Sequence, residues 1–274
     1  MQYMQFTKDS SYLGLAESIA ETIINLQDQG SGGGIRGGPT VGWYSTEHNL
    51  DAYAFFNMLA KATGKSIYST AAQKAVSWMV NNTYDRKDLP VKRGKGDSTI
   101  ATDTYAWSIA AIGPEKLLSL NMDPDKILEF VEENCRVEVN FIRPGSDQSV
   151  KIKGFDFAPQ RHTARGGVVS SEWTAQMVVS YKIMEEFYAK KGIQAKAALY
   201  NQKAQMYLSE LGKMIISSAS PSGQGQGCLP YATLDQVDTG HGWATPKGSH
   251  TGSVSGTAYT LFAYYGFNPL ELKE

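Results

Sequence analysis

The chain has 274 residues and a formal net charge of −1, with 42% hydrophobic and 19% charged residues. This length allows a substantial hydrophobic core, and we predict a single domain over residues 1–274. The balanced charge argues against a nucleic-acid partner and against a disordered acidic chain. No apolar run approaches the ~20 residues that span a bilayer, and no signal pattern stands at the start. We therefore predict a soluble protein without a membrane span. If a leader was removed, the protein is secreted or periplasmic, so its localisation stays open, as does its oligomeric state.

Most of the chain carries apolar residues at helical spacing, and the helices follow one another as antiparallel pairs. We predict helices at residues 11–27, 46–63, 66–82, 103–111, 115–120, 124–134, 171–191, 194–217 and 256–265. Two alternating stretches, residues 136–142 and 150–157, predict a small β-hairpin. The fold class is mostly α. Sequential helical hairpins joined by long loops are typical of an α/α toroid, in which the inner helices begin at one mouth. We predict such a toroid here, complete or incomplete, with a small β-hairpin and long loops at the mouth.

The predicted helix from residue 46 begins with an unusual number of ionisable side chains. Glu47, His48 and Asp51 stand in its first two turns, directly after a glycine-rich segment at residues 30–42. Glu47 and Asp51 are four residues apart and so project from one helix face. Buried charges are costly unless they are paired or functional, so we interpret this helix start as part of a site and the glycine-rich segment as a mobile binding loop.

The same pattern recurs at three other predicted helix starts. Asp103, Glu172 and the segment 253–259 each follow a polar loop and hydroxyl residues of the kind that cap helices. A simpler interpretation is that Ser or Thr followed by an acidic residue makes a good helix N-terminus. The pattern therefore indicates helix starts firmly, and it indicates a shared site only if the starts meet at one mouth.

Aromatic residues make up 11% of the chain, with 15 Tyr and 5 Trp. Tyr and Trp near glycine-rich loops make flat platforms on which sugar rings can stack. Tyr53 and Trp107 are equally consistent with a place in the hydrophobic core. Trp78 lies on an apolar stripe in the middle of a helix, so we predict that it is a core residue. The remaining candidates for a platform are Trp43, Trp173 and Trp243.

Four short motifs together resemble those of the bacterial α/α-toroid proteins, the six-hairpin glycosidase-like group. They are Ser45–Tyr53 (STEHNLDAY), Phe155–Phe157 (FDF), Ser171–Met177 (SEWTAQM) and Gly256–Tyr259 (GTAY) with Asn268-Pro269. The resemblance touches most of the chain. It implies a helical toroid and carbohydrate processing.

Glycoside hydrolysis needs one carboxylic acid and one carboxylate on opposite sides of the scissile bond. We predict Glu47 and Glu172 as the catalytic pair, facing each other from different hairpins, with Asp103 as the third candidate. The predicted substrate-binding residues surround these positions: Trp43, His48, Asp51, Tyr53, Trp107, Asp156, Arg161, Trp173, His241 and Trp243. The favoured function is hydrolysis of a poly- or oligosaccharide.

Two other functions stay open. In a polysaccharide lyase, Tyr53 or His48 would abstract a proton from the sugar, and Arg36 or Arg161 would neutralise a uronate. A non-catalytic carbohydrate-binding or scaffold domain would keep the aromatic mouth without the chemistry. These alternatives differ in their products, because a lyase releases unsaturated sugars and a binding module releases nothing.

Other chemistries have little support in the sequence. The histidines show neither an HxH nor an HExxH spacing, so we predict no metal and no cofactor. The glycine runs lack the context of a nucleotide-binding loop, and no GxSxG elbow indicates a serine hydrolase. Cys135 and Cys228 do not form a CxxC pair, and we interpret them as buried or incidental thiols.

Overall fold

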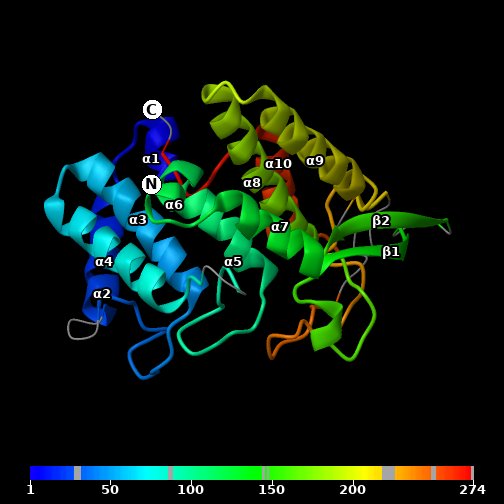
Figure 1. The fold of residues 1–274 in the computed structure, drawn as a ribbon, viewed down its shortest axis with the longest axis horizontal. Helices are drawn as coiled ribbons and strands as arrows, with labels where there is room; N and C mark the ends of the chain where they lie inside the picture. The colour runs from blue at the N-terminus through cyan, green and yellow to red at the C-terminus, as the bar shows by residue number, and fades with distance from the viewer. Residues whose placement is uncertain are drawn as a thin grey trace. The chain divides into compact units, whose positions relative to one another are not determined.

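The computed structural model describes residues 1–27, 32–85, 89–143, 146, 148–217, 226–247 and 251–272 (Figure 1). The chain forms two compact units. Unit 1 comprises residues 1–99, 107–123 and 268–274, and unit 2 comprises residues 100–106 and 124–267. The expectation of one domain over residues 1–274 stays a prediction.

Unit 1 is helical throughout its regular structure. Its elements are α1 (Gln2–Thr7), α2 (Leu13–Leu26), α3 (Thr46–Thr63), α4 (Ser66–Asn82), a π-helix (Ser108–Ile112) and α6 (Pro114–Ser119). The sequence predicted α2, α3, α4 and α6 but not α1, which is six residues long and buries no side chain. Helices α3 and α4 form the predicted hairpin and pack most closely together. Trp78 of α4 is fully buried, as predicted.

The ends of α3 follow from local chemistry. Ser45 precedes the helix, and its Oγ accepts a hydrogen bond from the backbone N–H of His48. Glu47 in the first turn and Lys61 in the last turn both complement the helix dipole. The helix ends at Gly64, whose φ of 71° lies in the left-handed region that glycine adopts without strain.

The described part of the glycine-rich segment is anchored to the neighbouring helices. The backbone N–H and C=O of Ile35 both bond the buried carboxamide of Asn49 on α3. Gln27 donates to the carbonyl groups of Gly33 and Ala71. A Cβ on Gly34 would lie 2.5 Å from the indole of Trp78, so only glycine allows this approach. Close packing therefore gives a structural reason for Gly34, and the mobile binding loop stays a prediction. Residues 28–31 lie outside the described residues.

The predicted helix at residues 103–111 is two elements, α5 (Thr102–Trp107) and the π-helix that follows it. The end of the π-helix leaves carbonyl groups without a helical partner. The carboxamide of Asn268 donates to the carbonyl oxygen of Ala110, 2.8 Å away. Asn268 is buried, and this contact gives a structural reason for an asparagine there.

Unit 2 combines helices with a β-hairpin. Besides α5, its elements are α7 (Pro124–Cys135), β1 (Arg136–Ile142), β2 (Ser149–Phe155), a 3₁₀ turn (Gln160–His162), α8 (Ser171–Lys190), α9 (Gln194–Gly212) and α10 (Val254–Tyr265). The strands form the predicted β-hairpin, with Arg136 opposite Phe155 and Ile142 opposite Ser149, and the second strand ends two residues earlier than predicted. Helix α9 is shorter than predicted. The apolar residues after it leave the helix, and Ile216 exchanges backbone hydrogen bonds with Cys228 and Gly227 instead.

Helix α8 is the centre of unit 2, and both α9 and α10 pack against it (Figure 1). Ser170 Oγ caps α8 through the N–H of Trp173, and Ser253 Oγ caps α10 through the N–H of Gly256. Gly256 is buried, and a Cβ there would lie 2.2 Å from the Oγ of Ser171. The small residues at this helix start therefore allow α10 to approach α8 closely.

Candidate functional site

The thirteen predicted site residues are divided between the two units. Unit 1 contains Trp43, Glu47, His48, Asp51, Tyr53 and Trp107, and unit 2 contains Asp103, Asp156, Arg161, Glu172, Trp173, His241 and Trp243. Glu47 and Glu172 thus belong to different units, and their facing arrangement stays a prediction. Each unit contains a polar cluster of its own.

In unit 2, helices α5 and α8 run side by side in the same direction. The start of α5 is joined to Phe157, whose ring packs 4.8 Å from that of Trp173 near the start of α8. One to two turns further on, Ser180 Oγ donates to the carbonyl oxygen of Ala106. The first turns of the two helices therefore lie at the same end, and these turns carry Asp103 and Glu172.

The two carboxyl groups have different surroundings. Asp103 is only 7% exposed, and its Oδ1 accepts a hydrogen bond from the N–H of Thr104. Glu172 is half-buried, and the carboxamide of Gln176, one turn later, lies 3.4 Å from its Oε1. A buried carboxyl beside a more accessible one gives two environments, which is how enzymes separate acid and base roles.

Aromatic rings surround the start of α8. Phe157 packs against Trp173, Tyr231 and Trp243, with ring centroids 4.8–5.8 Å apart. The ring of His241 lies 5.7 Å from that of Trp173, and its Nε2 lies 2.9 Å from the carbonyl oxygen of Phe157. The structure thus brings three predicted residues, Trp173, His241 and Trp243, into one cluster. Trp243 is 39% exposed and Trp173 only 7%, so Trp243 offers more surface for stacking.

Asp156 has a different environment from the one expected of a substrate contact. It is fully buried, and its carboxylate accepts two hydrogen bonds from Arg165, at 2.7 and 2.8 Å. The N–H groups of Phe157 and Val168 donate to the same carboxylate. These bonds fix the segment that carries Phe157. Asp156 therefore has a structural role, which is to hold this loop in place through its hydrogen bonds. Substrate binding by Asp156 stays a prediction.

Two arginines of the same loop have separate partners. Arg165, which the sequence analysis did not select, pairs with Asp156. Arg161, which it did select, is exposed, and its Nη2 donates to Oδ1 of Asn134 at the end of α7. Only the local loop RHTARGG indicated that either residue was of interest, and it did not distinguish them.

In unit 1, the predicted residues of α3 gather around Asp51. The indole N–H of Trp107 donates to Oδ1 of Asp51. Burial of the Asp51 carboxyl within protein atoms raises its pKa to about 6, and the negative charge of Glu47 adds to the rise. The Trp107 hydrogen bond and the charge of His48 act in the opposite direction. Because Asp51 still reaches solvent, it is a carboxyl that exchanges protons near neutral pH.

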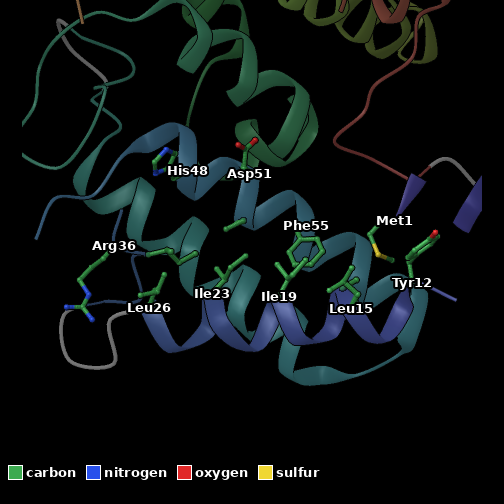
Figure 2. A pocket seen from close by; sticks show the side chains of 13 residues that line it. Met1, Tyr12, Leu15, Ile19, Ile23, Leu26, Arg36, His48, Asp51 and Phe55 are labelled. Carbon is green, nitrogen blue, oxygen red and sulfur yellow. The ribbon is translucent and has the colours of Figure 1, made fainter. Parts of the chain in front are cut away.

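A cavity of about 600 Å³ lies between α2 and α3 (Figure 2). Its polar lining residues are His48 and Asp51 of α3 and Arg36, and the guanidinium of Arg36 is directed away from the other two. The rest of the lining is almost entirely apolar, with Met1, Tyr12, Leu15, Ala16, Ile19, Ile23, Leu26, Ile35, Ala52 and Phe55. Outside the cavity lining, Trp43 is 52% exposed and its ring lies 5.4 Å from that of His48.

The remaining residues are in or near the core. Tyr53 is 9% exposed, and burial raises the pKa of its hydroxyl. Trp107 is also 9% exposed, so its indole contributes a hydrogen bond more readily than a stacking surface. Cys135 and Cys228 are free thiols, and burial raises the pKa of Cys135 to about 12. Among the described residues, no group of three or more His, Cys, Asp or Glu side chains is placed to hold a metal ion.

Comparisons with known proteins concern the fold. No protein-family model matches the sequence, and no curated protein matches it. Solved structures do match. An unsaturated glucuronyl hydrolase from Streptococcus agalactiae has a TM-score of 0.66 at 14% identity, covering 97% of this chain and 67% of that one. A family 76 glycoside hydrolase (mannosidase) from Bacteroides thetaiotaomicron gives 0.54 at 15%, covering 97% and 67%. A polysaccharide lyase gives 0.56 at 12%, covering 97% and 69%.

The fold is a mostly helical α/α toroid, as predicted. The identities are too low to show more than the fold, since one fold hosts many functions. This chain spans 67% of the first family 76 structure and 53% of a second one. Within the described residues, no helix of the toroid is both long and apolar enough to cross a membrane.

Proposed function

We propose that this chain is a carbohydrate-active enzyme, a glycoside hydrolase that cleaves a poly- or oligosaccharide by carboxylate acid/base catalysis. The observation that carries the proposal is the pair Asp103 and Glu172, in the first turns of two parallel helices. The aromatic cluster beside Glu172 supplies the stacking surface that a sugar ring needs. The matched structures named as family 76 glycoside hydrolases support the same reaction class by analogy of fold.

Acid/base hydrolysis requires one carboxyl that holds a proton and one that does not, ~5 to 10 Å apart. Asp103 is buried and Glu172 is more accessible, so the two carboxyl groups differ in their exposure to solvent. Glu47, which the sequence predicted as the partner of Glu172, is the third candidate in this proposal, in unit 1 with Asp51. We propose Trp243 and Trp173 as the sugar platform, with His241 positioned on Trp173.

A lyase is the second candidate, because a polysaccharide lyase is among the matched structures. It is less favoured on chemical grounds. A lyase base must lose its proton easily, whereas burial raises the pKa of Tyr53. Of the two arginines suggested to neutralise a uronate, Arg161 already donates to Asn134. A non-catalytic binding domain would use the aromatic cluster alone.

The test uses the purified chain and its Glu172→Gln, Asp103→Asn and Glu47→Gln variants, with a panel of neutral and uronate polysaccharides. Reducing ends and ultraviolet-absorbing unsaturated products are measured together. Hydrolysis predicts reducing ends without unsaturated products, and a loss of at least a hundredfold in Glu172→Gln and Asp103→Asn. Glu186→Gln is the matched control, because this side chain on the same helix is 63% exposed.

The possible outcomes separate the candidates. Unsaturated products would identify a lyase, and retention of a glycan without cleavage would identify a binding domain. Full activity in both the Glu172→Gln and Asp103→Asn variants would refute the assigned pair. Loss in Glu47→Gln alone would move the chemistry to unit 1. Circular dichroism of each variant checks that it is folded.

A further inference from the structure

Gln176 stands one turn after Glu172 on α8, and it is only 3% exposed. Its Nε2 donates to Oε1 of Glu172 over 3.4 Å, which is long for a hydrogen bond of this kind. Among the described residues, nothing donates to the buried Oε1 of Gln176. A buried acceptor without a partner is costly, so its presence in a folded protein calls for an explanation. In the described part of the chain, this carboxamide therefore serves one group, the carboxyl of Glu172.

The carboxamide of a glutamine can both donate and accept hydrogen bonds. Its N–H faces Glu172, and this orientation suits an ionised carboxylate. A turn of about 180° around the last side-chain bond, a torsion with a roughly two-fold preference, brings the oxygen to that place instead. The oxygen suits a protonated carboxyl, which donates its O–H. Since the described residues offer this side chain no other hydrogen bond, the bond to Glu172 decides between the two orientations.

Catalysis by a carboxyl group requires a partner of this kind. In the proposed hydrolysis, a catalytic acid gives its proton away and regains it in each turnover, and a base does the reverse. A partner that only donates, or only accepts, loses its hydrogen bond to the carboxyl in one half of the cycle. Because a misplacement of ~1 Å can cost a hundredfold in rate, the carboxyl has to keep its position in both halves.

We propose that Gln176 is a positioning residue for Glu172, whose carboxamide stays bonded to this carboxyl in both protonation states by turning when the proton arrives or leaves. With Glu172 ionised, the N–H of Gln176 donates to the carboxylate. With Glu172 protonated, the carboxyl O–H donates to Oε1 of Gln176. The proton is exchanged with substrate or water, and Gln176 neither gains nor loses one. The role in catalysis rests on the proposed function, whereas the turn of the carboxamide does not.

Other charged and titratable groups lie on the elements packed against this end of α8. They are Asp103 on α5, the buried pair of Asp156 and Arg165, and His241. In the structure as described, none of these side chains bonds the carboxamide of Gln176. A test of the proposal therefore has to separate titration of Glu172 from titration of these neighbours.

The first experiment is an NMR titration, which needs no substrate. The side-chain amide and carbonyl resonances of Gln176 are followed from mild acid to neutral pH, together with the carboxyl carbon of Glu172. They are expected to shift with the same midpoint as Glu172 and to stay constant over that range in Glu172→Gln. Gln205 is the matched control, because its Nε2 also lies 3.4 Å from a side-chain oxygen one turn away, that of the uncharged Asn201.

The second experiment measures hydrolysis against pH in Gln176→Met, which keeps the length of the side chain and removes both hydrogen bonds. We expect kcat to fall ~10- to 100-fold at every pH and KM to change less than ~twofold, because a misplaced carboxyl affects the transition state most. Both limbs of the pH profile are expected to stay within ~0.3 pH unit, since the lost bond stabilised both protonation states. Gln205→Met is expected to leave kcat unchanged.

Several results would overturn the proposal. Gln176 resonances that stay constant while Glu172 titrates, or that still shift in Glu172→Gln, would exclude the turn of the carboxamide. An acidic limb that moves up by ~1 pH unit in Gln176→Met would show that Gln176 bonds only the ionised carboxylate. Unchanged kcat in this variant would mean that Gln176 only fills the core. A parent chain without hydrolysis would refute the proposed function, and the NMR titration would still decide whether the carboxamide turns.

Discussion

The indole Nε1 of Trp107 donates a hydrogen bond to Oδ1 of Asp51, 2.5 Å away and 56 residues distant in the sequence. It stabilises the charged carboxylate against the burial that raises the pKa of Asp51 to about 6. The two effects oppose each other, and burial is the larger. This balance determines at what pH Asp51, which lines the cavity between α2 and α3, carries a negative charge.

Replacing Trp107 by Phe is expected to raise the pKa of Asp51 above 6. The substitution removes a hydrogen bond to the charged form while leaving an apolar ring in place. Carbon-13 NMR titration of the Asp51 carboxyl measures the change directly. Trp43→Phe, a change at an exposed ring without a hydrogen bond to Asp51, is the control. An unchanged pKa in Trp107→Phe would show that the hydrogen bond does not form in solution.

Asp51 also makes stability depend on pH. Its folded pKa of about 6 exceeds the ordinary value of 3.8, so the folded chain binds the proton more tightly than the unfolded chain does. The stability from this group is complete below pH 3.8 and is lost as the pH rises through 6. The free energy of unfolding is expected to fall less between pH 4 and pH 7 in Asp51→Asn than in the parent. Urea unfolding at both pH values measures the difference, and parallel curves would contradict it.

The buried pair Asp156–Arg165 is expected to be far more important for stability than a surface pair. Arg165→Leu leaves a fully buried carboxylate without its cation, which costs ~3 to 5 kcal/mol in the free energy of unfolding. Lys190→Ala breaks the exposed pair with Glu186 and is expected to cost at most ~0.5 kcal/mol. Urea denaturation of both variants tests the comparison. Similar losses in the two would show that solvent reaches Asp156.

Gly256→Ala is expected to destabilise unit 2 by ~1 to 3 kcal/mol through overpacking. The new Cβ would meet the Oγ of Ser171, which donates to the carbonyl oxygen of Pro230. Ser171→Ala removes that oxygen, so the double variant is expected to lose less than the sum of the two single losses. A double-mutant cycle from thermal unfolding measures the coupling. Strict additivity would mean that the helices move apart instead.

Ionised Asp125 is expected to contribute to the free energy of unfolding in mild acid, until the pH falls far enough to protonate it. Although burial raises its pKa, hydrogen bonds from Lys196, Tyr188 and Tyr200 outweigh that effect and leave the pKa below its ordinary value of 3.8. Its contribution is therefore present above pH 3.8 and is lost as the pH falls through the folded pKa. Tyr200→Phe removes one bond and is expected to reduce the loss of unfolding free energy between pH 5 and pH 3. Tyr264→Phe, at an exposed tyrosine, is the control.

Local chemistry made much of the fold predictable. Ser45 and Gly64 delimit α3 to the residue, and the alternating stretches locate the β-hairpin to within two residues at the end of β2. The error at the end of α9 has an equally local origin. Residues 214–216 are apolar and extend the helical pattern, but Ile216 is buried through backbone pairing with Cys228. Apolar periodicity alone does not distinguish these two kinds of burial.

The candidate site was less predictable, because its relationships are long-range. The sequence singled out Asp156 but gave no reason to choose Arg165 over Arg161 as its partner. It placed Asp51 and Trp107 in the same site without indicating their hydrogen bond. Trp173, His241 and Trp243 meet because α8 and the loop after α9 both contact Phe157. No spacing rule encodes a contact of that kind, which depends on tertiary packing.

Unit 1 is built from both ends of the chain, which lie close together (Figure 1). Gln2 donates hydrogen bonds to the carbonyl oxygens of Pro269 and Glu271, and Lys61 donates to that of Leu272. These bonds cannot form until the ribosome has added residue 272. During synthesis, helices α1 to α4 are made before unit 2, and their last partners in unit 1 are made after it. Unit 2 is therefore in a position to fold before unit 1 is complete.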